Sequence, residues 1–205
     1  ETAAQIILQI YHGNDGFIVE TKADNSPLTE ADKRANDFIC KELKSLYPFV
    51  PIISEENKND DYETRKNYKY AWLIDPLDGT KEFIKRNGEF TVNIGLIYYG
   101  EPVAGFVNIP VEGKTYWAIK GHGAWLKEIG KESISLEDKR NSYSSRRNKL
   151  RVISSRSHMS DETKNYVEKL GEIDLVNVGS SIKILWIAEN SADIYPRMAP
   201  TMEWD

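Results

Sequence analysis

The chain contains a single cysteine, Cys40, among its 205 residues. One thiol cannot form an intramolecular disulfide, so a disulfide scaffold is excluded and a reducing compartment is favoured. No run of about 18 apolar residues is present, which excludes an integral membrane helix within this sequence. We therefore expect a cytoplasmic protein, with peripheral association at the inner membrane left open as an alternative.

The sequence also lacks an excess of positive charge. It has 27 Lys and Arg against 32 Asp and Glu, for a net charge of −5. Such a balance gives no overall attraction for nucleic acid or anionic lipid, so we expect no nucleic-acid partner. An anionic ligand would need a local positive site or a metal ion. Hydrophobic residues at 40% and aromatic residues at 11% are typical of a folded globular protein.

The first part of the chain predicts helices and a mostly antiparallel sheet. Residues 3–11 form an amphipathic pattern, and Thr29 with Asp32 is a capping-box pattern before a second helix that ends near Pro48. Apolar runs predict strands at residues 50–54, 70–74, 90–99, 102–108, 115–119 and 124–126. We interpret residues 1–147 as an N-terminal α+β domain that carries the main metal site.

The composition changes between residues 129 and 151. From Lys139 to Arg151 there are six basic residues and no acidic one, which predicts a solvated loop between domains. Beyond it, predicted strands at 150–154, 175–178 and 192–195 alternate with predicted helices at 161–170 and 181–190. This alternation is typical of an α/β unit, which we assign to residues 148–205 as a C-terminal domain with nucleotide contacts.

Two aspartates directly after an apolar run are the most informative feature. Asp75 and Asp78 are separated by Pro76 and Leu77 and followed by Gly79 and a helix start at Thr80. Paired carboxylates suit a hard cation such as Mg²⁺, and the N–H groups of a helix start suit a phosphate. The pattern indicates a metal-assisted phosphoryl site, although a capped turn would use the same residue types. A second acidic pair, Glu55 and Glu56, is equally consistent with a solvated surface.

Four separated segments resemble one known family. D-N-S-P-L-T-E-A-D at 24–32, S-E-E at 54–56, D-P-L-D-G-T at 75–80 and W-D at 204–205 occur in this order in the inositol monophosphatase-like superfamily. The longer run at 78–94 is similar to that of the bacterial 3'(2'),5'-bisphosphate nucleotidases. The resemblance covers nearly the whole chain and implies a layered α-β-α-β-α sandwich of the sugar phosphatase type, of mixed α+β and α/β class. Family members continue beyond W-D, so it also implies a truncated C-terminal domain here.

The resemblance implies a role for individual residues. Two or three Mg²⁺ ions would be held by the side chains of Glu55, Asp75, Asp78 and Asp205 and by the backbone carbonyl of Leu77. The residues that would hold or activate the attacking water are Asp32, Glu55 and Thr80. Gly79 and Thr80 would donate backbone N–H groups to the phosphate. The further substrate contacts implied by the family segments are His158, Ser180, Lys183, Arg197 and Asp205.

The implied activity is hydrolysis of the 3'-phosphate of adenosine 3',5'-bisphosphate to AMP and phosphate. It would extend to the sulfated analogue and would use a metal-activated water without a covalent intermediate. Lithium commonly inhibits the family, and its nucleotidases serve sulfur metabolism. The partner would be a small phosphorylated nucleotide, and a homodimer is left open.

Three alternatives accompany this interpretation. The same chemistry could act on an inositol monophosphate or a sugar bisphosphate. A haloacid-dehalogenase phosphatase would carry D-x-D-G-T, whereas here two residues, Pro76 and Leu77, separate the aspartates. A non-catalytic phosphonucleotide-binding protein is the third alternative, and the retained acidic positions argue against it.

Overall fold

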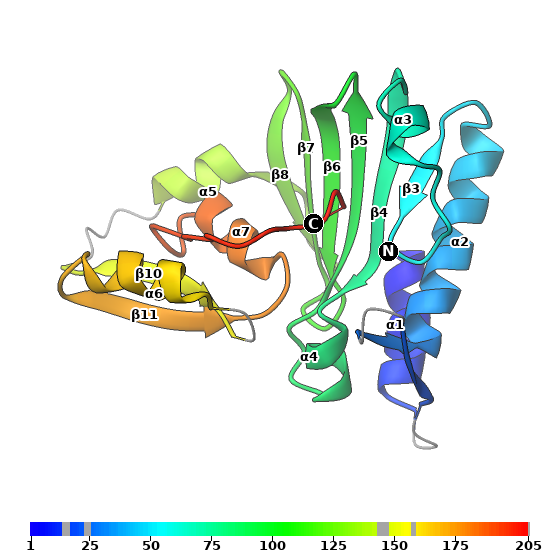
Figure 1. The fold of residues 1–205 in the computed structure, drawn as a ribbon. Helices are drawn as coiled ribbons and strands as arrows, with labels where there is room; N and C mark the ends of the chain where they lie inside the picture. Colours follow the sequence, from blue (N-terminus) through cyan, green and yellow to red (C-terminus); the bar gives the residue numbers. More distant parts are fainter. Residues whose placement is uncertain (14–16, 23–25, 143–147, 157–158, 205) are drawn as a thin grey trace.

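The computed structural model describes residues 1–13, 17–22, 26–142, 148–156 and 159–204. Its centre is a seven-stranded sheet with helices on both sides (Figure 1). β3 runs parallel to β4, and every other neighbouring pair in this sheet is antiparallel. The strands, in sheet order, are β3 (Ile52–Ser54), β4 (Tyr70–Asp78), β5 (Thr91–Tyr98), β6 (Glu101–Ile109), β7 (Lys114–Ile119), β8 (Gly123–Glu128) and β9 (Ile134–Ser135).

Two helices, α1 (Thr2–Tyr11) and α2 (Glu30–Leu46), cover one face of this sheet at its β3–β5 side. Their apolar positions pack with Trp72, Ile74 and Phe83 in the first hydrophobic cluster. A short hairpin of β1 (Val19–Thr21) and β2 (Pro27–Thr29) leads into α2. The capping box predicted at Thr29 and Asp32 is confirmed, which fixes the start of α2.

The opposite face of the sheet packs against a second α/β unit (Figure 1). Tyr116 on β7 and Leu126 on β8 are cross-strand partners, so their side chains lie on the same face of the sheet. There they meet Ile153 and Leu185 in a second hydrophobic cluster. The elements of this unit are β10 (Leu150–Ser155), α6 (Asp161–Glu168), β11 (Ile173–Val178) and α7 (Ile182–Ala188). α5 (Leu136–Ser142) precedes them and contacts β8 and β9 of the large sheet. β10 and β11 pair in parallel around the α6 crossover. The predicted class, a layered sandwich of helices and sheets, is confirmed.

Three local predictions are wrong. The strand predicted at 70–74 is too short, because β4 continues through Pro76 to Asp78 across a register shift between Asp75 and Asp78. A proline cannot donate to the ladder, and the irregularity accommodates it without ending the strand. The strand predicted at 192–195 is reduced to one bridge between Val152 and Ile194, held by a few backbone hydrogen bonds of residues 193 and 194 to residues 151 and 153.

The third wrong prediction is the fully solvated basic loop. Its first residues belong to α5, and the Lys139 side chain is only 17% exposed because it pairs with Glu189. Part of the segment, 143–147, lies outside the described residues, as does the proposed boundary between 1–147 and 148–205. A short helix, α3 (Tyr62–Arg65), interrupts the polar excursion after β3, and α4 (Thr80–Ile84) begins where a helix start was predicted. None of the described helices is long and apolar enough to cross a membrane.

Candidate active site

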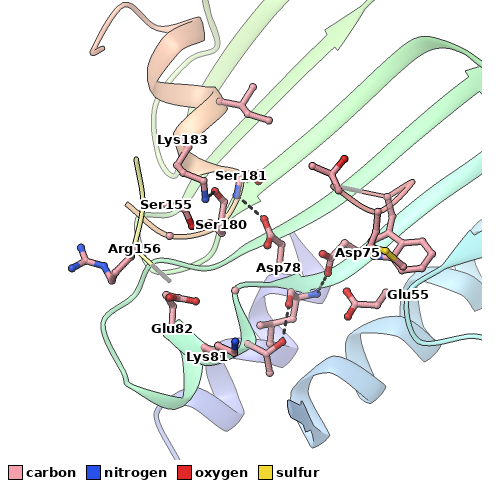
Figure 2. Close-up of a pocket in the computed structure, with 18 of the residues that line it drawn as sticks. Glu55, Asp75, Asp78, Lys81, Glu82, Ser155, Arg156, Ser180, Ser181 and Lys183 are labelled. Carbon is pink, nitrogen blue, oxygen red and sulfur yellow. Dashed lines mark hydrogen bonds between the residues drawn. The ribbon is translucent and has the colours of Figure 1, made fainter. Parts of the chain in front are cut away.

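A cavity of about 650 Å³ opens between the large sheet and the second unit. Its walls come from the β4–α4 junction, the β11–α7 junction and the segment that follows Ala192. Figure 2 shows Asp78 of β4 next to Ser181 at the start of α7, with Asp75 lying on the side of Glu55. The predicted site residues that line the cavity are Glu55, Asp75, Leu77, Asp78, Gly79, Thr80, Ser180, Lys183 and Arg197.

The β4–α4 junction directs oxygen atoms toward the cavity. Asp75 is 2% exposed, and its Oδ1 accepts the backbone N–H of Leu77 at 3.0 Å. The Leu77 side chain is buried in the core, whereas its carbonyl oxygen lies 3.3 Å from Thr80 Oγ1. The apolar identity of Leu77 is therefore compatible with a role for its backbone carbonyl.

Gly79 makes the tight turn between β4 and α4. Its φ of 95° lies in the left-handed region. A Cβ there would lie 2.9 Å from the Glu89 carbonyl oxygen and 3.2 Å from Ser180 Cβ. Only glycine satisfies both the conformation and the close approach of the second unit.

Asp32 lies behind the cavity wall, on the first turn of α2. Its Oδ1 accepts the Thr80 hydroxyl at 3.1 Å, and its Oδ2 accepts the Thr29 backbone N–H at 2.8 Å. Burial raises the pKa of the Asp32 carboxyl, against hydrogen bonds from Thr29 and Thr80 that lower it. The same carboxylate thus caps α2 and accepts a hydrogen bond from the Thr80 hydroxyl.

Glu55 reaches the site because β3 is parallel to β4. The Glu55 backbone N–H donates to the Ile74 carbonyl at 3.0 Å, which places it beside the Asp75 end of β4. Its side chain is paired with Lys22, whose Nζ lies 2.6 Å from Glu55 Oε1 and 2.6 Å from Glu56 Oε1. Sequence reasoning missed Lys22, because nothing in its local pattern points to residues 55 and 56.

This ion-pair group is partly buried. Burial raises the pKa of Glu56 to about 7, against the hydrogen bond and charge of Lys22. Burial lowers the pKa of Lys22, but the two carboxylates outweigh it and hold that pKa above its ordinary value. Lys22 therefore stays cationic and neutralises part of the acidic group.

The second unit contacts the acidic strand directly. The Ser181 backbone N–H donates to Asp78 Oδ2 at 2.6 Å (Figure 2). The Ser181 hydroxyl lies 2.8 Å from Thr91 Oγ1 and 2.9 Å from Asn93 Oδ1 on β5. Sequence reasoning singled out the neighbouring Ser180 and missed these roles of Ser181, Thr91 and Asn93, which depend on contacts between distant segments.

Basic side chains line the other part of the cavity. Lys183 is 6% exposed, donates to the Ser180 carbonyl and lies 5.6 Å from the centre of the Tyr195 ring. Arg197 also lines the cavity and donates to the Pro200 carbonyl at 3.2 Å. The structure thus brings the predicted cations Lys183 and Arg197 into the same cavity as the predicted acids.

Two predicted site residues, His158 and Asp205, lie outside the described residues. Within the described part of the chain, no three His, Cys, Asp or Glu side chains are grouped closely enough to hold a metal ion. The cavity does present carboxylates and a carbonyl, the donors that suit Mg²⁺. That ion uses only one or two protein carboxylates and keeps waters or substrate oxygens as its other ligands. The chemistry of the donors fits such a cation.

The inositol monophosphatase family model matches residues 1–205, and the chain belongs to this family. Among curated proteins, the 3'(2'),5'-bisphosphate nucleotidase CysQ of Escherichia coli K12 is 45% identical over 204 residues, covering 99% of this chain and 79% of that protein. The crystal structure of CysQ from Bacteroides thetaiotaomicron, described as a bacterial member of the same family, has a TM-score of 0.79 and 41% identity. The match covers 99% of this chain and 78% of that one.

A solved structure of much lower sequence identity has a similar fold. An IMPase/NADP phosphatase, solved with Mg²⁺ and phosphate, is 19% identical with a TM-score of 0.71, covering 93% of this chain and 68% of that one. At this identity the likeness concerns the fold alone.

Proposed function

We propose that this chain is a Mg²⁺-dependent phosphatase that removes the 3'-phosphate of adenosine 3',5'-bisphosphate, giving AMP and phosphate. The observation that carries the substrate is the 45% identity to a 3'(2'),5'-bisphosphate nucleotidase across 99% of the chain. The cavity supports it, since about 650 Å³ is within the range of small-molecule sites. The sulfated analogue of this nucleotide would be a second substrate.

The acidic part of the cavity would receive the scissile phosphate. Glu55, Asp75, Asp78 and the Leu77 carbonyl would share two or three Mg²⁺ ions between them, with Asp205 as a further ligand, so that each ion takes one or two carboxylates. Bound Mg²⁺ supplies charge neutralisation of the phosphate oxygens and a lowered pKa of bound water. The backbone N–H groups of Gly79 and Thr80 would donate to the same phosphate.

Thr80 and Asp32 would orient the attacking water. The Thr80 hydroxyl has one proton, which it directs to Asp32 Oδ1 at 3.1 Å or to the Leu77 carbonyl at 3.3 Å. Its lone pairs are then left to accept a hydrogen bond from water, which turns a water lone pair toward phosphorus. Glu55 would orient the water and accept its proton. No protein nucleophile is required, so we expect no covalent intermediate.

The basic part of the cavity would bind the rest of the nucleotide. Lys183 and Arg197 supply positive charge for the second phosphate in a protein whose net charge is −5. Ser180 and His158 would add polar contacts. This separation of acids and cations distinguishes a substrate with two phosphates from a monophosphate.

Phosphate release from four substrates tests the proposal: adenosine 3',5'-bisphosphate, its sulfated analogue, inositol 1-phosphate and fructose 1,6-bisphosphate. We expect the bisphosphate nucleotide to turn over fastest, with loss of activity in EDTA and inhibition by Li⁺. Faster turnover of inositol 1-phosphate or the sugar would replace this substrate with one of those. Nucleotide binding without phosphate release would instead indicate a non-catalytic binding protein, and a trapped aspartyl-phosphate at Asp75 would overturn the mechanism.

A further inference from the structure

A buried polar network lies between α2 and the turn after β3, behind the cavity wall. Asn36 on α2 is 5% exposed, and Ser54 at the end of β3 is 0% exposed. The Ser54 hydroxyl donates to Asn36 Oδ1 at 2.7 Å, and Asn36 Nδ2 donates to Asn57 Oδ1 at 2.9 Å. None of these residues is assigned a role in the proposed reaction.

The polar groups of Ser54 are satisfied by neighbouring asparagines. Its backbone N–H donates to Asn59 Oδ1 at 3.0 Å, and its carbonyl accepts Asn59 Nδ2 at 2.8 Å. Its hydroxyl binds Asn36 and also lies 3.4 Å from the Glu56 backbone N–H. Ser54 directly precedes Glu55, so the network fixes the backbone from which the Glu55 carboxylate projects.

Asn36 lies one helical turn after Asp32, and residues four apart share a face of an α-helix. Asp32 binds Thr80 at the α4 junction, whereas Asn36 binds Ser54 at the end of β3. One face of α2 therefore contacts both segments that carry predicted catalytic groups. Small changes in the distance between those groups would alter metal and water geometry.

We propose that Asn36 is a positioning residue, which acts through Ser54 to set Glu55 relative to Asp32 and Thr80. This inference rests on the proposed function for the identity of Glu55 as a metal ligand. Residues that orient metal ligands typically change affinity by about 10- to 100-fold when they are replaced. A buried amide of purely structural value would alter stability and leave metal affinity unchanged.

Mn²⁺ binding, followed by electron paramagnetic resonance without substrate, tests the inference independently of turnover. In Asn36→Leu we expect the Mn²⁺ dissociation constant to rise about tenfold, with a parallel rise in the Mg²⁺ concentration for half-maximal phosphate release. Ser54→Ala, which removes one hydroxyl and perturbs folding least, should have a similar effect. The double variant should bind Mn²⁺ no more weakly than the weaker of the two single variants, because both substitutions break the same chain of hydrogen bonds.

Asn108→Leu is the matched control. Asn108 makes a comparable bond, donating to Thr115 Oγ1 at 2.8 Å between β6 and β7, away from the cavity. Asn108→Leu should lower the melting temperature but leave the Mn²⁺ affinity at its wild-type value. Wild-type Mn²⁺ affinity in Asn36→Leu and Ser54→Ala would overturn the inference while bisphosphate hydrolysis by the unmodified protein still stood. If both variants bind Mn²⁺ more weakly as expected, but the unmodified protein does not hydrolyse the nucleotide, only the proposed function is overturned.

Discussion

Asp78 Oδ2 accepts the Ser181 backbone N–H at 2.6 Å, joining two residues that are 103 positions apart in the sequence. Asp78 belongs to the irregular end of β4, and Ser181 is the N-cap of α7. The orientation of a predicted metal ligand is therefore set by the unit that carries the predicted nucleotide contacts. A shift of the second unit would therefore also change the geometry of the β4–α4 junction.

Asp78→Asn separates the charge of this residue from its hydrogen bond. The asparagine Oδ1 can still accept from Ser181, so we expect little change in melting temperature. Loss of the negative charge should weaken metal binding and lower kcat/KM by about 100-fold or more, since a ligand to the activating ion contributes several kcal/mol. Steady-state phosphate release at several Mg²⁺ concentrations measures this effect. Asp37→Asn, at an exposed position on α2, is the control, and wild-type kinetics in Asp78→Asn would contradict the metal model.

Lys22→Met tests the cation beside Glu55 and Glu56. The Lys22 ammonium lies 2.6 Å from both carboxylates, and under the proposed function it would compete with a metal ion for their charge. Its removal should tighten Mg²⁺ or Mn²⁺ binding about three- to tenfold in the absence of substrate, which corresponds to about 1 kcal/mol at a partly screened site. Titration calorimetry measures the change. Weaker metal binding would mean that Lys22 supports the ligand arrangement instead of competing with the ion.

Asp78 belongs to a local turn motif, whereas Lys22 reaches the site through a tertiary contact, and this difference decides which of the two could be predicted from the sequence. Asp75, Asp78, Gly79 and Thr80 are consecutive or nearly so, and their turn chemistry is local, so their meeting in one site was predictable. The capping box at Thr29 is local for the same reason. Lys22, directly after β1, meets Glu55 and Glu56 through a tertiary contact that spans more than 30 positions of the chain. No local pattern carries such a contact.

The errors in secondary structure have the same origin. Pro76 is a strong local signal for a strand end, but pairing between β4 and β5 resumes at Asp78 and Thr91 after the irregularity. Lys139 sits in a basic stretch that indicates a solvated loop, but a buried carboxylate on the second unit binds it. In both cases a tertiary contact outweighs a local tendency, and the contact is visible only once the chain is folded.

Glu189 predicts a pH dependence of stability. Burial alone would raise its pKa, but hydrogen bonds from Lys139 and Ser191, with the Lys139 charge and the Tyr116 hydroxyl, hold the pKa below the ordinary 4.5. A carboxyl whose pKa is lower in the folded state stabilises the fold above pH 4.5, and this stabilisation is lost as pH falls through the folded-state pKa. Glu189→Gln should therefore flatten the acid limb of a plot of melting temperature against pH.

The same variant should lower the free energy of unfolding at pH 7 by about 3 kcal/mol, because Lys139 loses its buried counter-ion. Urea unfolding at pH 7 and at pH 4 measures both effects. Glu137→Gln, on the exposed side of α5, is a suitable control, because it removes a carboxylate without disturbing this pair. An unchanged acid limb in Glu189→Gln would show that another carboxyl governs the acid transition.

Gly179→Ala tests whether the close approach of the two units positions the nucleotide contacts. A Cβ at Gly179 would lie 2.8 Å from Glu82 Cγ and 2.9 Å from the Glu89 carbonyl, while its backbone N–H donates to Glu89 Oε2 at 2.8 Å. The added methyl must push the start of α7 away from the sheet, at a cost of about 1–3 kcal/mol in stability. Ser180 and Ser181 would move with it, so KM for the bisphosphate nucleotide should rise and kcat should fall. Gly105→Ala, where a Cβ would meet nothing within 4 Å, should leave the kinetics unchanged. A loss of stability in Gly179→Ala with wild-type kcat and KM would show that the interface holds the units together without setting the site.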